Sequence, residues 1–145
     1  MDHLNFPYLG RVYADRLPEL SDQWIVSAPI RIVQHLANVW HLLEPKAFQR
    51  DGVHYRKDGH NVFAPMESEH PWTQWAMKSH ENYGWLYYYA EDIIENYKSR
   101  FISGPVPGKH GIFTMLSVLD AMPESVPEDG FSEPDFKTED LRWIP

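Results

Sequence analysis

Apolar residues recur at steps of three and four along two long stretches of this chain, and that spacing limits its possible folds more than any other feature. A residue at every third or fourth position lies on one side of a helix. The positions that follow the spacing are Ile25, Ala28, Ile32, Leu36, Val39 and Leu43 in the first stretch, and Trp72, Trp75, Ser79, Asn82, Leu86, Ala90, Ile93, Tyr97 and Phe101 in the second. The sequence therefore predicts two long helices that pack through these faces.

Particular residues set the expected ends of the first helix. Ser21 or Asp22 can cap its start with a side-chain oxygen. Glu44-Pro45 marks its end. Pro29 lies inside the helix, where its missing N–H predicts either a kink or two abutting helices.

The second stretch begins at His70-Pro71, where proline occupies a first-turn position that needs no N–H. Gly84 is expected as the point at which this segment can divide into two helices. After a Gly- and Pro-rich turn at 104–108, the apolar spacing predicts a third, short helix at 112–119.

The remaining segments lack helical spacing. Residues 1–19 are expected to form an extended arm and residues 121–145 an extended acidic tail. Residues 46–68 contain two Asp-Gly turns, which indicate a functional loop or a small hairpin. We therefore predict an all-α fold: a single compact domain with its helical body at 20–120.

The composition excludes several classes of protein. The 145 residues include no cysteine, which excludes disulfides, thiolate metal sites and a Cys nucleophile. No apolar run is long enough to span a bilayer, and no leader is expected at the N-terminus, so a cytoplasmic protein is predicted. Most of the formal charge of −8 is local, because residues 121–145 carry two cations against seven anions. The chain as a whole lacks the basic surface of a typical duplex-binding domain.

Familiar catalytic motifs are also absent. The sequence contains no HExxH, GxSxG, P-loop or GxGxxG pattern. Its eight histidines do not pair on one helix face, so no metal site is expected. Ser79, His80 and Glu81 are adjacent, so their side chains would diverge on a helix and could not form a triad. No catalytic residue, cofactor or metal is assigned.

Four polar residues lie where helix packing would favour carbon, namely Gln34, His35, Ser79 and Asn82. Buried amides and hydroxyls need hydrogen-bond partners. The cluster therefore either ties the two helices together or forms the polar end of an aromatic-lined pocket. In the second case Trp75, Tyr83 and Trp85 would supply flat walls suited to a nucleobase, although rings at this spacing are also common core residues.

Two segments resemble known proteins. Leu20-Ser21-Asp22-Gln23, with Ile25, Arg31 and Val39, resembles the first helix of the small all-helical pyrimidine-dimer DNA glycosylases of the bacteriophage endonuclease V type. His70-Pro71-Trp72-Thr73, with Ser79, Asn82-Tyr83, Trp85 and Arg100-Phe101, is similar to uncharacterised phage and bacterial proteins with a His-Pro...Trp...Ser...Asn-Tyr...Trp signature. The resemblance implies a helical fold that extrudes a nucleotide and attacks the sugar C1′ with an amine beside a carboxylate.

The chain departs from that family at two decisive positions. Arg31 falls where the family has its essential first-helix glutamate. The family's nucleophile is an N-terminal amine exposed by loss of the initiator methionine, whereas Asp2 is expected to keep Met1 in place. The standard glycosylase–lyase mechanism is therefore not expected. Arg31 could instead bind a phosphate or carboxylate, or pair with Asp22 or an acidic tail residue.

Three hypotheses follow. The first is a phage-type, DNA-base-directed protein that recognises or processes a modified or damaged pyrimidine, glycosylase-like but without the standard acid and amine. Its predicted ligand-binding residues are Arg31, Gln34, His70, Trp75, Ser79, Asn82, Tyr83 and Trp85. The second is a non-catalytic acidic protein that binds a basic protein partner, as a nucleic-acid mimic or an inhibitor of a host enzyme. The third is an enzyme that acts on a free nucleotide.

Overall fold

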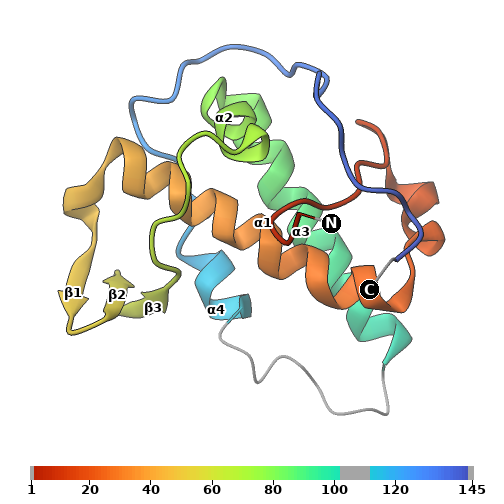
Figure 1. Cartoon of the computed structure of the whole chain (residues 1–145), viewed down its shortest axis with the longest axis horizontal. Helices are drawn as coiled ribbons and strands as arrows, with labels where there is room; N and C mark the ends of the chain where they lie inside the picture. Colours follow the sequence, from red (N-terminus) through yellow and green to blue (C-terminus); the bar gives the residue numbers. More distant parts are fainter. Residues whose placement is uncertain (1, 102–111, 144–145) are drawn as a thin grey trace.

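Two long helices form the centre of the protein. The computed structural model describes residues 2–101 and 112–143. Helix α1 (Asp22–Leu43) packs along helix α3 (His80–Arg100), the shorter α2 (Pro71–Met77) contacts both, and α4 (Ile112–Ser117) contacts α1 (Figure 1). Their facing sides bury the predicted apolar positions, including Ile25, Ile32 and Leu86. The helical faces read from the sequence are therefore confirmed.

The all-α prediction is wrong, because the chain also forms a three-stranded antiparallel sheet and is only about 49% helical. Strands β1 (Gln49–Asp51), β2 (His54–Lys57) and β3 (His60–Val62) follow one another between α1 and α2. Asp58 and Gly59 both have positive φ, the backbone of a type I′ hairpin turn, and Gly52 has positive φ at the first turn. The small hairpin expected as one interpretation of residues 46–68 is therefore present, extended by a third strand. The strands themselves are short and polar and lack apolar alternation, so the sequence does not predict a full sheet.

The helix ends follow the capping chemistry in part. Ser21 caps α1, since its Oγ accepts a hydrogen bond from the Trp24 N–H at 3.3 Å. Helix α1 continues through Pro29 as one element. The second stretch divides at Ser79 and not at Gly84, because the Ser79 Oγ accepts from the Asn82 N–H and starts α3 there. The Ser79 hydroxyl satisfies a backbone N–H that would otherwise be free at the start of α3, whereas Gly84 only lowers helix propensity.

The N-terminal arm contributes to the core. Phe6 and Leu9 are buried, and Phe6 stacks on Trp72 with ring centroids 4.3 Å apart. The arm ends in a 3-10 helix, η1 (Ala14–Glu19), so the prediction of an extended chain throughout residues 1–19 is wrong there. The arm is therefore a structural layer over α2 and α3.

The acidic tail is also part of the body. After α4 the chain has no further helix through residue 143, in line with the extended tail expected, but it packs closely. Val126 is buried, Phe136 meets Trp72 edge-on at 4.9 Å, and the Glu139 N–H donates to the Phe6 carbonyl. Arm and tail therefore lie side by side, as the red and dark blue segments of Figure 1 show.

The third helix predicted from the sequence can be compared with α4. The short helix expected at 112–119 is present as α4, whereas the turn expected at 104–108 lies outside the described residues.

Within the described residues, no helix is both long and apolar enough to cross a membrane.

Candidate nucleic-acid interface

Residues of the predicted pocket join the tail to the helices. Asn82 is buried and its amide donates to the Trp75 carbonyl at 2.9 Å and to the Ser132 hydroxyl at 3.0 Å, while its oxygen accepts from the Ser132 N–H. The Trp75 indole donates to the Ser132 carbonyl at 2.9 Å. Ser79 is used as the cap of α3. Trp75, Ser79 and Asn82 are thus brought together, but they bind the chain itself.

The other aromatic residues of that set also have internal partners. The Tyr83 hydroxyl donates to the Leu119 carbonyl at 2.7 Å, and burial raises the pKa of this phenol far above its ordinary value. The Trp85 indole donates to the Arg11 carbonyl, and its ring stacks on Tyr89. Gln34 is half-buried on α1. These contacts account for the aromatic faces without a ligand.

Arg31 holds the N-terminal arm. Its guanidinium donates to the Asn5 carbonyl at 2.7 Å and to the Asp2 carbonyl at 3.4 Å, and it lies 5.1 Å from the centre of the Trp24 ring. The pairing with Asp22 that the sequence left open does not form, because Asp22 pairs with Arg100. Arg31 is nearly buried, so its donors face the arm carbonyls.

Two histidines complete the attachment of the arm. The His35 Nε2–H donates to the Leu4 carbonyl at 2.6 Å, and its Nδ1 accepts from the Thr73 hydroxyl at 2.8 Å. The His70 Nδ1 accepts from the Trp72 N–H, so its Nε2–H donates to the Asp2 carboxylate at 2.7 Å. Burial lowers the pKa of His35 to about 3. Its ring is therefore neutral at physiological pH.

This arrangement determines what the histidine pair can do chemically. A general base needs a ring nitrogen that is free to face a substrate proton. All four nitrogens of His35 and His70 are already engaged with the chain. The pair therefore acts as a structural clamp and is not arranged as a catalytic base.

The outer face of the sheet, in contrast, presents polar side chains to solvent. Gln49 on β1, Arg56 on β2 and Asn61 on β3 are paired across the three strands and so form one row. Paired residues of antiparallel strands project from the same face. All three side chains are exposed. The Arg56 guanidinium donates one bond, from Nη2, to the Gly59 carbonyl at 2.7 Å. Its remaining N–H groups and the two carboxamides offer hydrogen-bond donors and acceptors at adjacent positions.

Residues on the inner face fix the orientation of the sheet. Lys57 is buried, and its ammonium donates to the Val118 carbonyl at 3.0 Å while lying 4.2 Å from the centre of the Trp40 ring. Val62 is buried where β3 contacts α4. Tyr55 meets His41 edge-on at 5.1 Å. Because this face is attached to the body, the row on the other face points outward.

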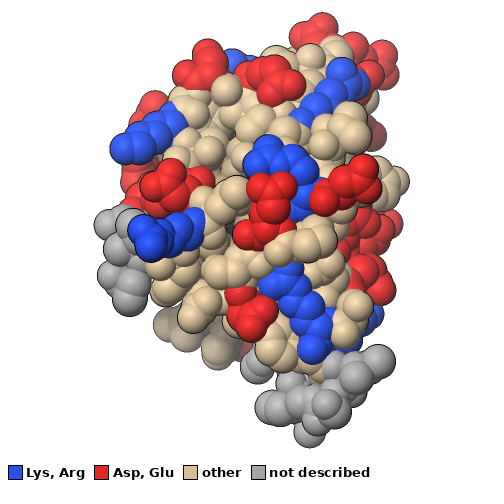
Figure 2. Space-filling view, turned by 90° about the vertical axis from the view of Figure 1, so that its right-hand side faces the viewer, with Lys and Arg blue, Asp and Glu red and all other residues tan. Residues whose placement is uncertain are grey.

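The charge of the sheet region differs from that of the rest of the chain. Residues 45–62 carry four of the thirteen Lys and Arg residues but only two of the twenty-one Asp and Glu residues. Lys46, Arg50 and Arg56 are exposed. At the opposite end of the molecule, Lys and Arg are interspersed with Asp and Glu (Figure 2). The sheet is thus a locally basic element on an acidic protein.

The spacing of the two turns is a sequence signal for this face. Asp51-Gly52 and Asp58-Gly59 are seven residues apart, as two consecutive hairpin turns of a meander would be. Alternation counted outward from those turns would place Arg56 on the face opposite Lys57. Which face is covered by the body follows only from the packing of Lys57 and Val62.

In residues 2–101 and 112–143, no three His, Asp or Glu side chains come together as a metal site would require. No protein family, curated protein or solved structure matches the chain.

Proposed function

We propose that the protein binds nucleic acid, with the outer face of its sheet against the edges of the bases. The observation that carries the proposal is the exposed row of Gln49, Arg56 and Asn61. Arginine bonds with two atoms of guanine, and asparagine and glutamine bond with two atoms of adenine. A β-ribbon is also narrow enough to enter the major groove.

Local charge supports the same proposal. Lys46 is exposed three residues before Gln49 and can contact a phosphate. Arg50 pairs with Tyr55, so its side chain lies on the other face of the sheet, over the Tyr55 ring. With so few cations, we expect the logarithm of affinity to fall with the logarithm of salt with a slope of only about −1 to −2. The acidic remainder of the chain would repel DNA, so that binding through the sheet leaves the other end free.

The proposal is recognition without cleavage. The resemblance to the pyrimidine-dimer glycosylases supports DNA bases as the ligand class. The chemistry of that family requires a carboxylate where this chain has Arg31, and Arg31 is bound to the arm. We therefore propose a base-directed reader in which the row contacts purine edges and the target is the modified or damaged pyrimidine opposite such a purine.

The test is fluorescence anisotropy and gel shift with duplexes that contain normal, hydroxymethylated or photodimerised thymine. We expect Arg56→Ala to weaken binding by about 1–3 kcal/mol, or roughly 5- to 150-fold. Arg142→Ala removes the same charge from an exposed position in the tail and is expected to leave affinity within about twofold. Equal losses for both variants would contradict a sheet interface.

A second pair of variants compares the two locations considered for the site. Asn61→Ala on the sheet should weaken binding and leave the melting temperature unchanged. Asn82→Ala removes three internal hydrogen bonds and should cost about 1–3 kcal/mol of stability while affinity is retained. If Asn82→Ala weakens binding and Asn61→Ala does not, the binding site lies on the helices. If a DNA strand is cleaved only where the base is altered, the protein is a glycosylase and the proposal of recognition alone is wrong.

A further inference from the structure

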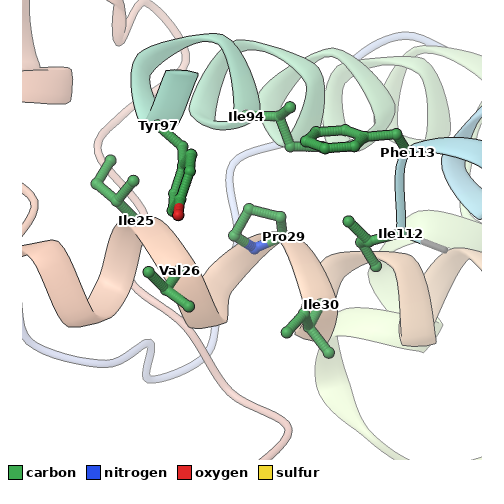
Figure 3. Close-up of a pocket in the computed structure, with 8 residues that line it drawn as sticks. All are labelled: Ile25, Val26, Pro29, Ile30, Ile94, Tyr97, Ile112 and Phe113. Carbon is green, nitrogen blue, oxygen red and sulfur yellow. The ribbon is translucent and has the colours of Figure 1, made fainter. Parts of the chain in front are cut away.

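A groove lined mainly by carbon lies between α1, α3 and α4. At its centre is a cavity of about 130 Å³. Figure 3 shows eight side chains around it, with Ile25, Val26, Pro29 and Ile30 from α1 facing Ile94 and Tyr97 from α3 and two residues of α4. The walls are mostly apolar, with the Tyr97 hydroxyl among them, so the cavity favours a largely apolar occupant.

The cavity continues into a hollow on either side. Ile94 and Phe113 also line a hollow that extends along α3 to Tyr87. Val26 also lines a third hollow, which reaches Trp143 in the tail. The three hollows therefore adjoin one another through shared wall residues and are taken together as one elongated groove.

Part of the apolar surface is open to solvent. Val26 is 45% exposed and Ile30 is 37% exposed, both on α1 beside the cavity. Covering neighbouring apolar side chains that are exposed to water is favourable in free energy, so such a surface is a candidate binding site.

Three of the four charged residues that line the three hollows are acidic. Glu91 and Glu95 lie at one end and Asp22 at the other. Lys98 also lines the groove and bonds to Glu95 at 3.2 Å, and Arg100 bonds to Asp22 at 3.1 Å. The three carboxylates and two cations leave an excess of one negative charge along the rim. A basic segment is therefore favoured over an acidic one, also by the net charge of −8.

We infer that this groove binds an amphipathic helix of a partner protein, with apolar side chains in the groove and lysine or arginine at its flanks. From Tyr87 to Lys98, α3 spans about 16 Å, the length of three helical turns. A helix of that length presents apolar anchors at i, i+3 or i+4, and i+7, which matches a row of three hollows. This surface is separate from the sheet, so the inference does not depend on nucleic-acid binding.

The test uses two labelled 18-residue peptides with the same leucine face, one with lysine and one with glutamate at all other positions. In fluorescence anisotropy at physiological salt, we expect the lysine peptide to bind at least about tenfold more tightly than the glutamate peptide. Equal binding, or no binding of the lysine peptide, overturns the inference.

The Val26→Glu variant tests whether the peptide binds in the groove, and Val12→Glu is its matched control. Val12 is 88% exposed in the arm and away from the groove lining. Either substitution adds a negative charge that attracts lysine, so loss of binding in a folded Val26→Glu variant alone indicates a blocked apolar wall. We expect a loss of about tenfold or more for Val26→Glu and none for Val12→Glu.

Ile30→Ser provides a second groove variant with a smaller change, and circular dichroism checks that each variant is folded. If affinity for the lysine peptide is the same in wild type, Val26→Glu and Ile30→Ser, the groove is not the binding surface. Sedimentation of the protein alone tests the other occupant. A dimer that dissociates in Val26→Glu would overturn the inference, because a second copy would then fill the groove.

Discussion

His35 is fully buried and bridges the arm to α2 through both ring nitrogens. A protonated ring could no longer accept from the Thr73 hydroxyl, and its charge would lie in the core. Asp2 adds to the same attachment. Burial alone would raise its pKa, but the Leu4 N–H and His70 bonds together lower it below its ordinary value. Both residues therefore favour the folded arm at neutral pH.

The pKa of about 3 for folded His35 gives a prediction for stability against pH. The unfolded chain binds a proton at this residue below about pH 6.5, whereas the folded chain does so only near pH 3. Stability from this group is complete above pH 6.5 and is lost as the pH falls from 6.5 toward 3, by at most about 1.4 kcal/mol per pH unit.

Urea unfolding of the wild type and His35→Gln measures this dependence. Glutamine keeps one donor and one acceptor but does not titrate, so its stability should fall less steeply between pH 6.5 and 4.5. Parallel profiles for the two proteins would show that His35 does not titrate in this way.

At the scale of the elements, the sheet has little apolar area and is held by few contacts. Lys57 is its main polar anchor, because its ammonium bonds to the Val118 carbonyl and lies over Trp40. A buried ammonium without partners would be costly, but here the carbonyl, the ring and Asp58 compensate it.

Lys57→Met should therefore loosen the sheet without unfolding the helices. We expect hydrogen exchange at residues 54–62 to speed up by a factor that corresponds to about 1–3 kcal/mol, with α1 and α3 unaffected. Lys46→Met removes an exposed lysine next to the sheet and serves as the control. Unchanged protection in Lys57→Met would mean that Val62 and Tyr55 suffice to hold the sheet.

At the scale of the whole molecule, arm and tail close over α2 and α3. Pro7 and Glu139 form a parallel bridge, and Ser132 bonds with both Trp75 and Asn82. The tail contains the acidic residues, and its apolar side chains pack against the hydrophobic core.

Removal of residues 121–145 should accordingly destabilise the protein rather than uncover a binding surface. It would leave the Trp75 indole N–H without its carbonyl partner, leave the Trp40 indole with the Tyr83 hydroxyl alone, and expose the rings that the tail covers. We expect a large loss of melting temperature or of cooperative unfolding in calorimetry. A truncated chain with the wild-type melting temperature would show that the tail is only an accessory.

The sequence by itself determined the local elements of this protein. Apolar spacing depends only on neighbouring helical turns, so it located both long helices. Ser21 could be predicted as the N-cap of α1 because its own side chain makes the capping hydrogen bond. Asp58-Gly59 likewise specifies a tight hairpin through its own backbone preferences.

Only the tertiary structure decided the use of the polar side chains. Asn82 and Arg31 have the same chemistry in a ligand pocket as in a clamp, and their partners, Ser132 and Asn5, lie far away in sequence. The exposure of Gln49, Arg56 and Asn61 was equally undetermined, because alternation defines two faces of a sheet but not which one the body covers. That choice depends on long-range contacts, which no local pattern encodes.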